Sequence, residues 1–78
     1  MVIYPGKILR PGMTGFTVKV LQQSMNEEKE LIKDEGCFEN GVYDERTAEM
    51  VRKYRNFFGL PDGDTTGYFL WNRLVNKC

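Results

Sequence analysis

Apolar residues recur at helical spacing in three stretches of the chain. In the first stretch they stand three, four and seven residues apart, at Val18, Leu21, Met25 and Ile32. This spacing gathers them on one stripe of a helix, whereas the polar residues Lys19, Gln22 and Gln23 lie off the stripe. The pattern therefore predicts an amphipathic helix whose apolar stripe faces a core.

The limits of this first helix follow from glycine and charge. Gly15 marks the start, and the apolar pattern runs to residue 32, so we expect the helix over residues 15–32. The charged Glu28 and Lys29 occupy positions where the stripe calls for apolar residues. Residues 27–30 therefore either extend the helix or begin a loop.

A second helix is predicted over residues 44–58. Asp44 suits the N-cap, because its carboxylate can accept hydrogen bonds from the unpaired N–H groups that open a helix. Gly59 is a plausible terminator, and Pro61 just beyond it cannot continue a helix. The apolar face has helical period and consists of Thr47, Met50, Val51, Tyr54, Phe57 and Phe58.

A third, shorter helix is predicted over residues 67–76. It opens at Thr66 or Gly67, and its apolar residues share one face at Leu70, Trp71, Leu74 and Val75. Residues 1–14 form an N-terminal arm in which Ile8 and Leu9 are able to pin the arm to a core. Two glycines in residues 35–41 exclude a long helix there, and a short extended ribbon is possible near residues 38–43.

Three amphipathic helices must bury their stripes against one another. Seventy-eight residues, of which 41% are hydrophobic and 28% charged, form one small core and one domain, residues 1–78. We therefore expect an all-α fold, a small orthogonal three-helix bundle with glycine-rich turns.

Composition also excludes several functions. Eleven basic and eleven acidic residues give a net charge of zero, so nothing in the overall charge attracts nucleic acid. Nothing in the sequence is apolar over a length that spans a bilayer, and the start lacks the pattern of a secretory signal. If the domain works outside a cell, a parent chain, an excision or a phage-induced lysis must bring it there.

Histidine is absent and cysteine is scarce. Without histidine, the chain lacks the commonest general base and metal ligand, and Cys37 with Cys78 cannot fill a zinc site. We expect no metal and no cofactor, and two free thiols rather than a bridge between the cysteines. A bundle this small has little room to bury a pair of catalytic acids, so we expect no catalytic residues.

The order of the motifs resembles one known family. Peptidoglycan-binding domains carry Gly-x-x-Gly-x-x-Val-x-x-Leu-Gln, then Asp-Gly-x-Phe-Gly-x-x-Thr, then Ala-Val-x-x-Phe-Gln, and later Gly-Leu, Asp-Gly, Gly and Thr-Trp-x-x-Leu. The chain matches this pattern along nearly its whole length. The departures are Tyr43-Asp44 for Phe-Gly, Arg55 for the second Gln, Leu70 for the Thr before Trp, one added residue between Gly63 and Gly67, and a longer acidic stretch over residues 26–39. The matching residues are Gly12, Gly15, Val18, Leu21, Gln22, Asn40, Gly41, Tyr43, Asp44, Thr47, Val51, Tyr54, Gly59, Leu60, Asp62, Gly63, Gly67, Trp71 and Leu74.

The resemblance implies a fold and a function. Domains of this family are three-helix modules, usually fused to wall-lytic enzymes of bacteria and phages such as amidases and muramidases. The resemblance implies a monomeric, non-catalytic module that binds the stem peptide or glycan of peptidoglycan and is linked to a catalytic domain. It also implies that the module acts at the cell envelope or outside the cell. The alternative is a protein-docking or structural module that keeps the fold without wall binding.

Seven residues have the chemistry to contact such a ligand. Aromatic rings offer flat faces with a polar tip, aspartates accept hydrogen bonds or pair with an amine, and arginine can hold a carboxylate. The candidates are Tyr43, Asp44, Arg46, Asp62, Asp64, Tyr68 and Trp71.

Each candidate also has a structural interpretation. Trp71 lies on an inward stripe and favours the core, and Asp44 and Asp62 suit a cap and a turn. Tyr43 and Tyr68, next to glycine turns, leave both interpretations open. An exposed helix arginine such as Arg46, or Arg55 as a further candidate, is often a solvated charge.

Overall fold

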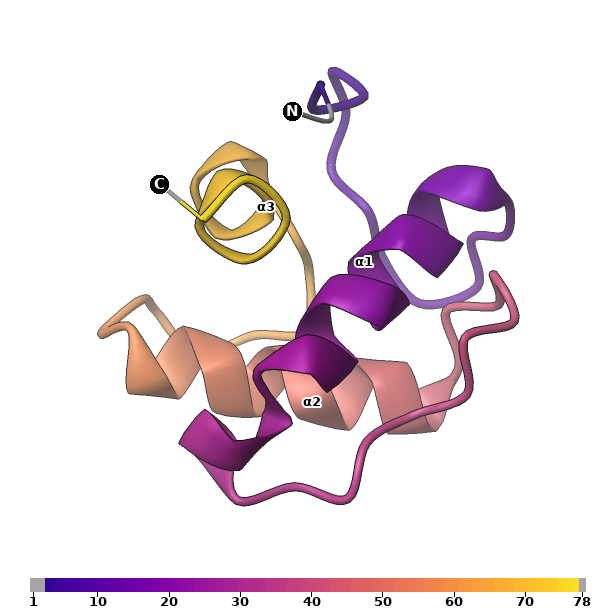
Figure 1. The fold of residues 1–78 in the computed structure, drawn as a ribbon. Coiled ribbons are helices and arrows are strands. Elements are labelled where there is room, and N and C mark those ends of the chain that lie inside the picture. Colours follow the sequence, from indigo (N-terminus) through magenta and orange to yellow (C-terminus); the bar gives the residue numbers. More distant parts are fainter. Residues whose placement is uncertain (1–2, 78) are drawn as a thin grey trace.

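The protein is a bundle of three short α-helices. The structure, a computed structural model, describes residues 3–77. In this range the helices are α1 (Phe16–Glu27), α2 (Glu45–Phe57) and α3 (Tyr68–Leu74), with a 3-10 turn η1 (Lys29–Ile32) after α1. Figure 1 shows α3 along its axis while α1 and α2 lie across the view, so α3 crosses both. The expected all-α, orthogonal three-helix bundle is confirmed.

The first helix is shorter than its apolar pattern predicted. It ends at Glu27, because Glu28 leaves the helical region with φ −118° and ψ 19°. Residues 29–32 form η1, which ends where Lys33 adopts the left-handed conformation at φ 52°. The expected continuous helix over residues 15–32 is therefore wrong beyond Glu27. The charged Glu28 and Lys29 interrupt the apolar stripe at this point, and η1 packs against α2 instead of continuing α1.

The second helix begins and ends where its local signals predicted. The Asp44 carboxylate accepts a hydrogen bond from Thr47 N at 2.9 Å. At the other end, Gly59 takes φ 74° and donates to Asn56 O, while Leu60 N donates to Arg55 O at 2.8 Å. These two bonds form a Schellman motif, which satisfies the last carbonyl groups of the helix.

The core lies where the apolar faces of the three helices meet. Trp71, Tyr43 and Tyr54 are its largest fully buried side chains. The aliphatic and methionine residues around them come from all three helices and from the N-terminal arm. The buried hydrophobic residues are Leu9, Val18, Val20, Leu21, Met25, Tyr43, Ala48, Met50, Val51, Tyr54, Leu70, Trp71 and Leu74.

Two isolated β-bridges tie the N-terminal arm to segments far along the chain. Leu9 pairs with Thr66 through reciprocal backbone hydrogen bonds of 3.0 and 2.9 Å, next to the start of α3. Thr14 pairs with Val42 just before α2. The extended stretch before α2 thus pairs with the arm. The arm therefore holds the segments just before α2 and just before α3.

Candidate functional site

Two of the seven predicted ligand contacts belong to the core. Trp71 is fully buried, and Tyr43 is only 1% exposed. The Tyr43 hydroxyl donates to Asp64 O at 2.6 Å and lies 3.2 Å from Thr66 Oγ1. Burial raises the pKa of Tyr43 to about 12, so the phenol stays protonated and keeps its donor. Neither aromatic ring offers a face to a ligand.

Asp44, a third predicted contact, works as a helix cap inside a buried polar network. Its carboxylate accepts from both the backbone N–H and the hydroxyl of Thr47, at 2.9 and 3.0 Å. The Thr47 hydroxyl in turn accepts from Gln22 Nε2 at 2.9 Å. The hydrogen bonds of this carboxylate therefore stabilise the start of α2.

Gln22 is the centre of this network, although its position on the helix predicted an outward side chain. The side chain is 0% exposed. Besides the bond to Thr47, its Nε2 donates to Val42 O at 2.8 Å, and its Oε1 accepts from Gly41 N at 2.8 Å. Every donor and acceptor of the amide is used, so α1 is joined to the segment before α2. The expectation that Gln22 lies off the buried face is wrong, because a satisfied amide can be buried at little cost.

Arg46, a fourth predicted contact, forms an ion pair with the buried carboxylate of Asp34. The Asp34 side chain is 0% exposed and also accepts from Lys53 Nζ at 2.7 Å and from Gly36 N at 2.8 Å. Burial alone would raise the pKa of Asp34. The hydrogen bonds from Lys53 and Gly36 and the charge of Arg46 outweigh it and hold that pKa below its usual range. No sequence signal pointed to Asp34.

Replacing Asp34 with asparagine should lower the free energy of unfolding by about 1–2 kcal/mol, because charge-assisted hydrogen bonds are lost while one acceptor remains. A carboxyl whose pKa is depressed on folding stabilises the protein above its unfolded pKa. This contribution disappears as pH falls through the folded pKa. The difference between the wild type and Asp34→Asn in urea titrations should therefore shrink below about pH 4. The exposed Asp62→Asn is the matched control, and an equal loss in both variants would contradict the role of Asp34.

The three remaining predicted contacts lie on the segment that joins α2 to α3. Asp62 is exposed, and the Asp64 carboxylate is 40% exposed and lies 3.4 Å from Arg52 Nη1. Tyr68, the first residue of α3, is 69% exposed. We call Asp62, Asp64 and Tyr68 the linker surface. These three residues are close together in the sequence, and Arg46 of α2 lies outside this stretch of chain.

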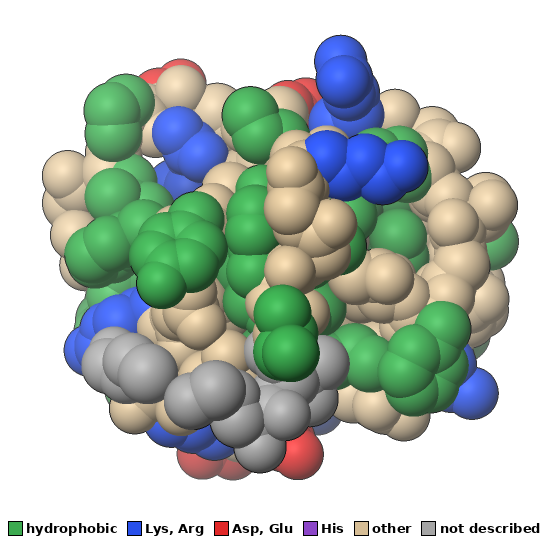
Figure 2. All heavy atoms as spheres, turned by 90° about the horizontal axis from the view of Figure 1, so that it is seen from above, with side chains coloured by type: hydrophobic (Ala, Val, Ile, Leu, Met, Phe, Trp, Pro, Cys, Tyr) green, Lys and Arg blue, Asp and Glu red, His purple; other side chains and the backbone are tan. Residues whose placement is uncertain are grey.

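One residue of the linker surface, Tyr68, is held by an aromatic contact. Tyr4 of the N-terminal arm packs edge-on against Tyr68, with ring centroids 5.6 Å apart. Tyr4 also packs against the buried Trp71 at 6.3 Å. The exposed ring of Tyr68 is thus connected to the core. Figure 2 looks onto the side that carries α3 and the arm, and shows apolar side chains spread over it.

Arg55 fixes the shape of the linker instead of offering a clamp for a carboxylate. Its Nε donates to Pro61 O at 2.9 Å and its Nη1 donates to Thr65 O at 2.8 Å. The guanidinium also lies against Gly63, where an added Cβ would approach Arg55 Nε to 3.5 Å. The interpretation of Arg55 as a ligand-binding residue is therefore not supported by its contacts.

The longer acidic stretch is held in place by Asn26. Its side chain donates to Cys37 O at 2.8 Å and accepts from Cys37 N at 3.0 Å, as a neighbouring strand would. Burial raises the pKa of the Cys37 thiol, which is free. Cys78 lies outside the described residues. A shallow polar hollow beside this stretch is lined by Gln23, Asn26, Glu27, Lys29 and Glu39.

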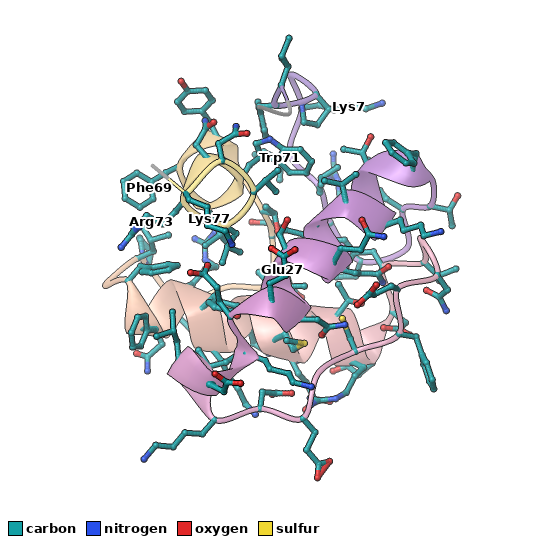
Figure 3. All side chains as sticks on the ribbon, in the orientation of Figure 1. Lys7, Glu27, Phe69, Trp71, Arg73 and Lys77 are labelled. Carbon is teal, nitrogen blue, oxygen red and sulfur yellow. The ribbon has the colours of Figure 1, made fainter. Side chains whose placement is uncertain are left out.

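Figure 3 shows how side chains of α3 divide between the interior and the surface. Trp71 points toward the arm and α1, whereas Phe69 and Arg73 lie on the outer side of the helix. The Arg73 guanidinium lies over the ring of Phe58, 4.8 Å from its centroid. Lys77 and Glu27 point toward each other, with Nζ 3.3 Å from Oε1, and join the end of α3 to the end of α1.

The described residues include neither a cluster of metal ligands nor a membrane-spanning helix. Among residues 3–77, no three acidic, cysteine or histidine side chains gather as ligands for a metal ion. In the same range, no helix has the length and apolar character needed to cross a membrane.

The helices and the buried polar network together define the class of fold. Three crossing helices, a buried glutamine that joins α1 to the start of α2, and turns built on glycine form the three-helix fold that the resemblance to peptidoglycan-binding domains implied. No family model matches the sequence, and no curated protein matches it either.

A solved structure has the same fold. It is the SleB N-terminal domain, which superimposes with a TM-score of 0.81 at 21% sequence identity, over 96% of this chain and 97% of that domain. At this identity the match establishes the fold.

Proposed function

We propose that this chain is a non-catalytic module that binds peptidoglycan and holds a wall-lytic enzyme, fused or partner, close to its substrate. The proposal is supported by two findings taken together. The motifs of the peptidoglycan-binding family occur in order along nearly the whole chain, and the fold matches the SleB N-terminal domain over 96% of this chain. The place of action would be the cell envelope or the outside of the cell.

The linker surface is the part of the molecule that we propose for ligand contact. The ring of Tyr68 offers an apolar face and a hydroxyl to an amino sugar or a stem peptide. Asp62 and Asp64 offer carboxylate acceptors for hydroxyl, amide or amine groups. The other predicted contacts have structural partners: Tyr43 and Trp71 in the core, Asp44 at the cap and Arg46 with Asp34.

A weak site is sufficient for this role. A module linked to an enzyme keeps that enzyme at a high effective concentration near an insoluble polymer, even when each contact is modest. Asp64 also has structural contacts. Asp64 pairs with Arg52, and the Asp64 carbonyl accepts from Tyr43, so the surface is pre-shaped.

The test of wall binding is a pelleting assay. The folded domain is incubated with purified sacculi, the sacculi are spun down, and the pellet is compared with that of a chitin control. We expect sacculi to deplete the domain and chitin to leave it in solution. A domain that stays in solution with both polymers and has no muralytic activity contradicts the proposal and favours a protein-docking module.

Replacing Tyr68 with alanine tests the surface itself. An exposed aromatic face contributes about 0.5–1.5 kcal/mol, so the affinity for sacculi should fall roughly two- to tenfold. Phe57→Ala is the matched control, since Phe57 is an exposed aromatic residue, 51% exposed, at the end of α2. Circular dichroism must show that both variants are folded. Unchanged binding by Tyr68→Ala would place the contact elsewhere, and an equal loss in both variants would indicate adsorption through any exposed ring.

A further inference from the structure

The peptide bond between Asn40 and Gly41 combines a reactive sequence with an unusual environment. Asn40 is the one asparagine of the chain that is followed by glycine; the residues after the other asparagines are Glu27, Phe57, Arg73 and Lys77. Asn40 is exposed, whereas Gly41 is buried and takes φ +75°. The bond therefore lies at the boundary between solvent and the buried polar network.

An asparagine followed by glycine can react with its own backbone. The backbone nitrogen of Gly41 loses its proton and attacks Asn40 Cγ, a C–N bond forms, and ammonia leaves, which gives a five-membered succinimide. Water then adds to either carbonyl of the ring, and the ring C–N bond to that carbonyl breaks. The products are aspartate or isoaspartate. Water is the one reagent consumed, and glycine favours the reaction because it has no Cβ to hinder ring closure.

The folded structure occupies the groups that this reaction needs. Gly41 N, the nucleophile, donates to Gln22 Oε1 at 2.8 Å, and the Asn40 carboxamide oxygen accepts from Val42 N at 3.0 Å. Gly41 is also held by close contacts with the backbone of Gly15. Its carbonyl accepts from Gly15 N at 2.9 Å, and a Cβ on Gly41 would come within 2.8 Å of Gly15 O. Neither the Gly41 nitrogen nor the Asn40 carboxamide is therefore free to move toward the other.

We propose that the Asn40–Gly41 bond is a self-modification site that the hydrogen bond from Gly41 to Gln22 keeps inactive, and that opening of this segment activates. The reaction needs a deprotonated and mobile Gly41 nitrogen, and the folded state provides neither. The inference concerns the chemistry of this segment and is independent of the proposed wall binding.

Formation of isoaspartate at this bond would prevent the chain from regaining its native structure. Isoaspartate places one extra carbon in the main chain, immediately before Gly41. The bonds of Gly41 to Gln22 and Gly15, and the bridge between Val42 and Thr14, depend on the register of this segment. A chain that has formed isoaspartate cannot restore all of them at once, so each opening event that ends in isoaspartate removes a molecule from the native population.

The first experiment compares one protein in two states. The full chain is incubated in mildly alkaline buffer, folded in one sample and unfolded in urea in the other, and peptides are followed by mass spectrometry. We expect conversion at Asn40 in urea and at least about tenfold slower conversion when folded, since reaction then requires local opening. Asn56, which precedes Phe57, serves as the internal control and should stay unchanged. Equal rates at Asn40 in the two states would overturn the proposal.

A second experiment separates the hydrogen bond from stability in general. Gln22→Ala removes the acceptor of Gly41, and Arg55→Ala destabilises the linker while leaving that acceptor in place. Under conditions in which both variants are folded, we expect faster conversion at Asn40 in Gln22→Ala alone. Equal acceleration in both variants would assign protection to overall stability and would contradict the role of Gln22. If Gln22→Ala does not fold, Gln22→Glu replaces it: this variant keeps an acceptor for Gly41, so conversion at Asn40 in the folded variant should stay as slow as in the wild type, and faster conversion would contradict the role of Gln22.

Discussion

Replacing Trp71 with alanine is expected to lower the free energy of unfolding by about 3–5 kcal/mol, as deletion of a large core aromatic does in other proteins. Trp71 is fully buried, and its neighbours in the core come from α1, α2 and the N-terminal arm. A domain of this size has a total stability on the order of 0.05–0.15 kcal/mol per residue. For 78 residues this is about 4–12 kcal/mol, so the substitution should remove a large part of the total stability.

Urea denaturation followed by circular dichroism measures this effect, and the chain contains a neighbouring control. Phe69 is a large aromatic residue on the same helix but is 58% exposed. Phe69→Ala should change the stability by less than about 1 kcal/mol. Should the two variants be equally stable, Trp71 would not be the anchor of the core.

Replacing Gln22 with alanine is the second substitution with a large expected effect, and we expect a loss of at least about 2 kcal/mol. The reason differs from that for Trp71, because little apolar surface is involved. The side-chain amide makes three hydrogen bonds, to Gly41 N, Val42 O and the Thr47 hydroxyl. Its removal leaves the buried Gly41 N–H without an acceptor, and such a group bears its full desolvation penalty.

Gln23 provides the matched control for this substitution. It has the same side chain on the next residue of α1, and it is exposed. Gln23→Ala should stay within about 0.5 kcal/mol of the wild type, and thermal or urea unfolding of the two variants measures the contrast. Gln22→Glu adds detail, because it keeps an acceptor for Gly41 and removes both donated bonds. If Gln22→Ala and Gln23→Ala were equally stable, the network would contribute nothing.

The second helix was predictable because its signals are local. Asp44 and Gly59 lie at its two ends, and each acts on backbone groups within a few residues. The end of α1 was harder to predict, because the apolar Ile32 continued the stripe beyond Glu28. Where the helix stops depends on how η1 packs against α2, which is a property of the folded molecule.

The candidate site was predictable only in part. Chemistry selected the right kinds of residue, but exposure decides which of them a ligand can reach. Tyr43 and Tyr68 both follow glycine turns, and only the structure separates the buried one from the exposed one. The ion pair between Asp34 and Arg46 joins two segments whose proximity is not encoded in local sequence. Gln22 was visible as part of a motif, although its burial was not.

The reciprocal bonds between Leu9 and Thr66 join positions near the two ends of the chain. During synthesis Leu9 is made well before its partner Thr66. Helices can form as they emerge, but Leu9 has no backbone partner until Thr66 is available, and closing so long a loop is entropically unfavourable. The final step of folding must therefore wait until translation of the domain is nearly complete, and a nascent chain that stalls before this point leaves Leu9 exposed to water.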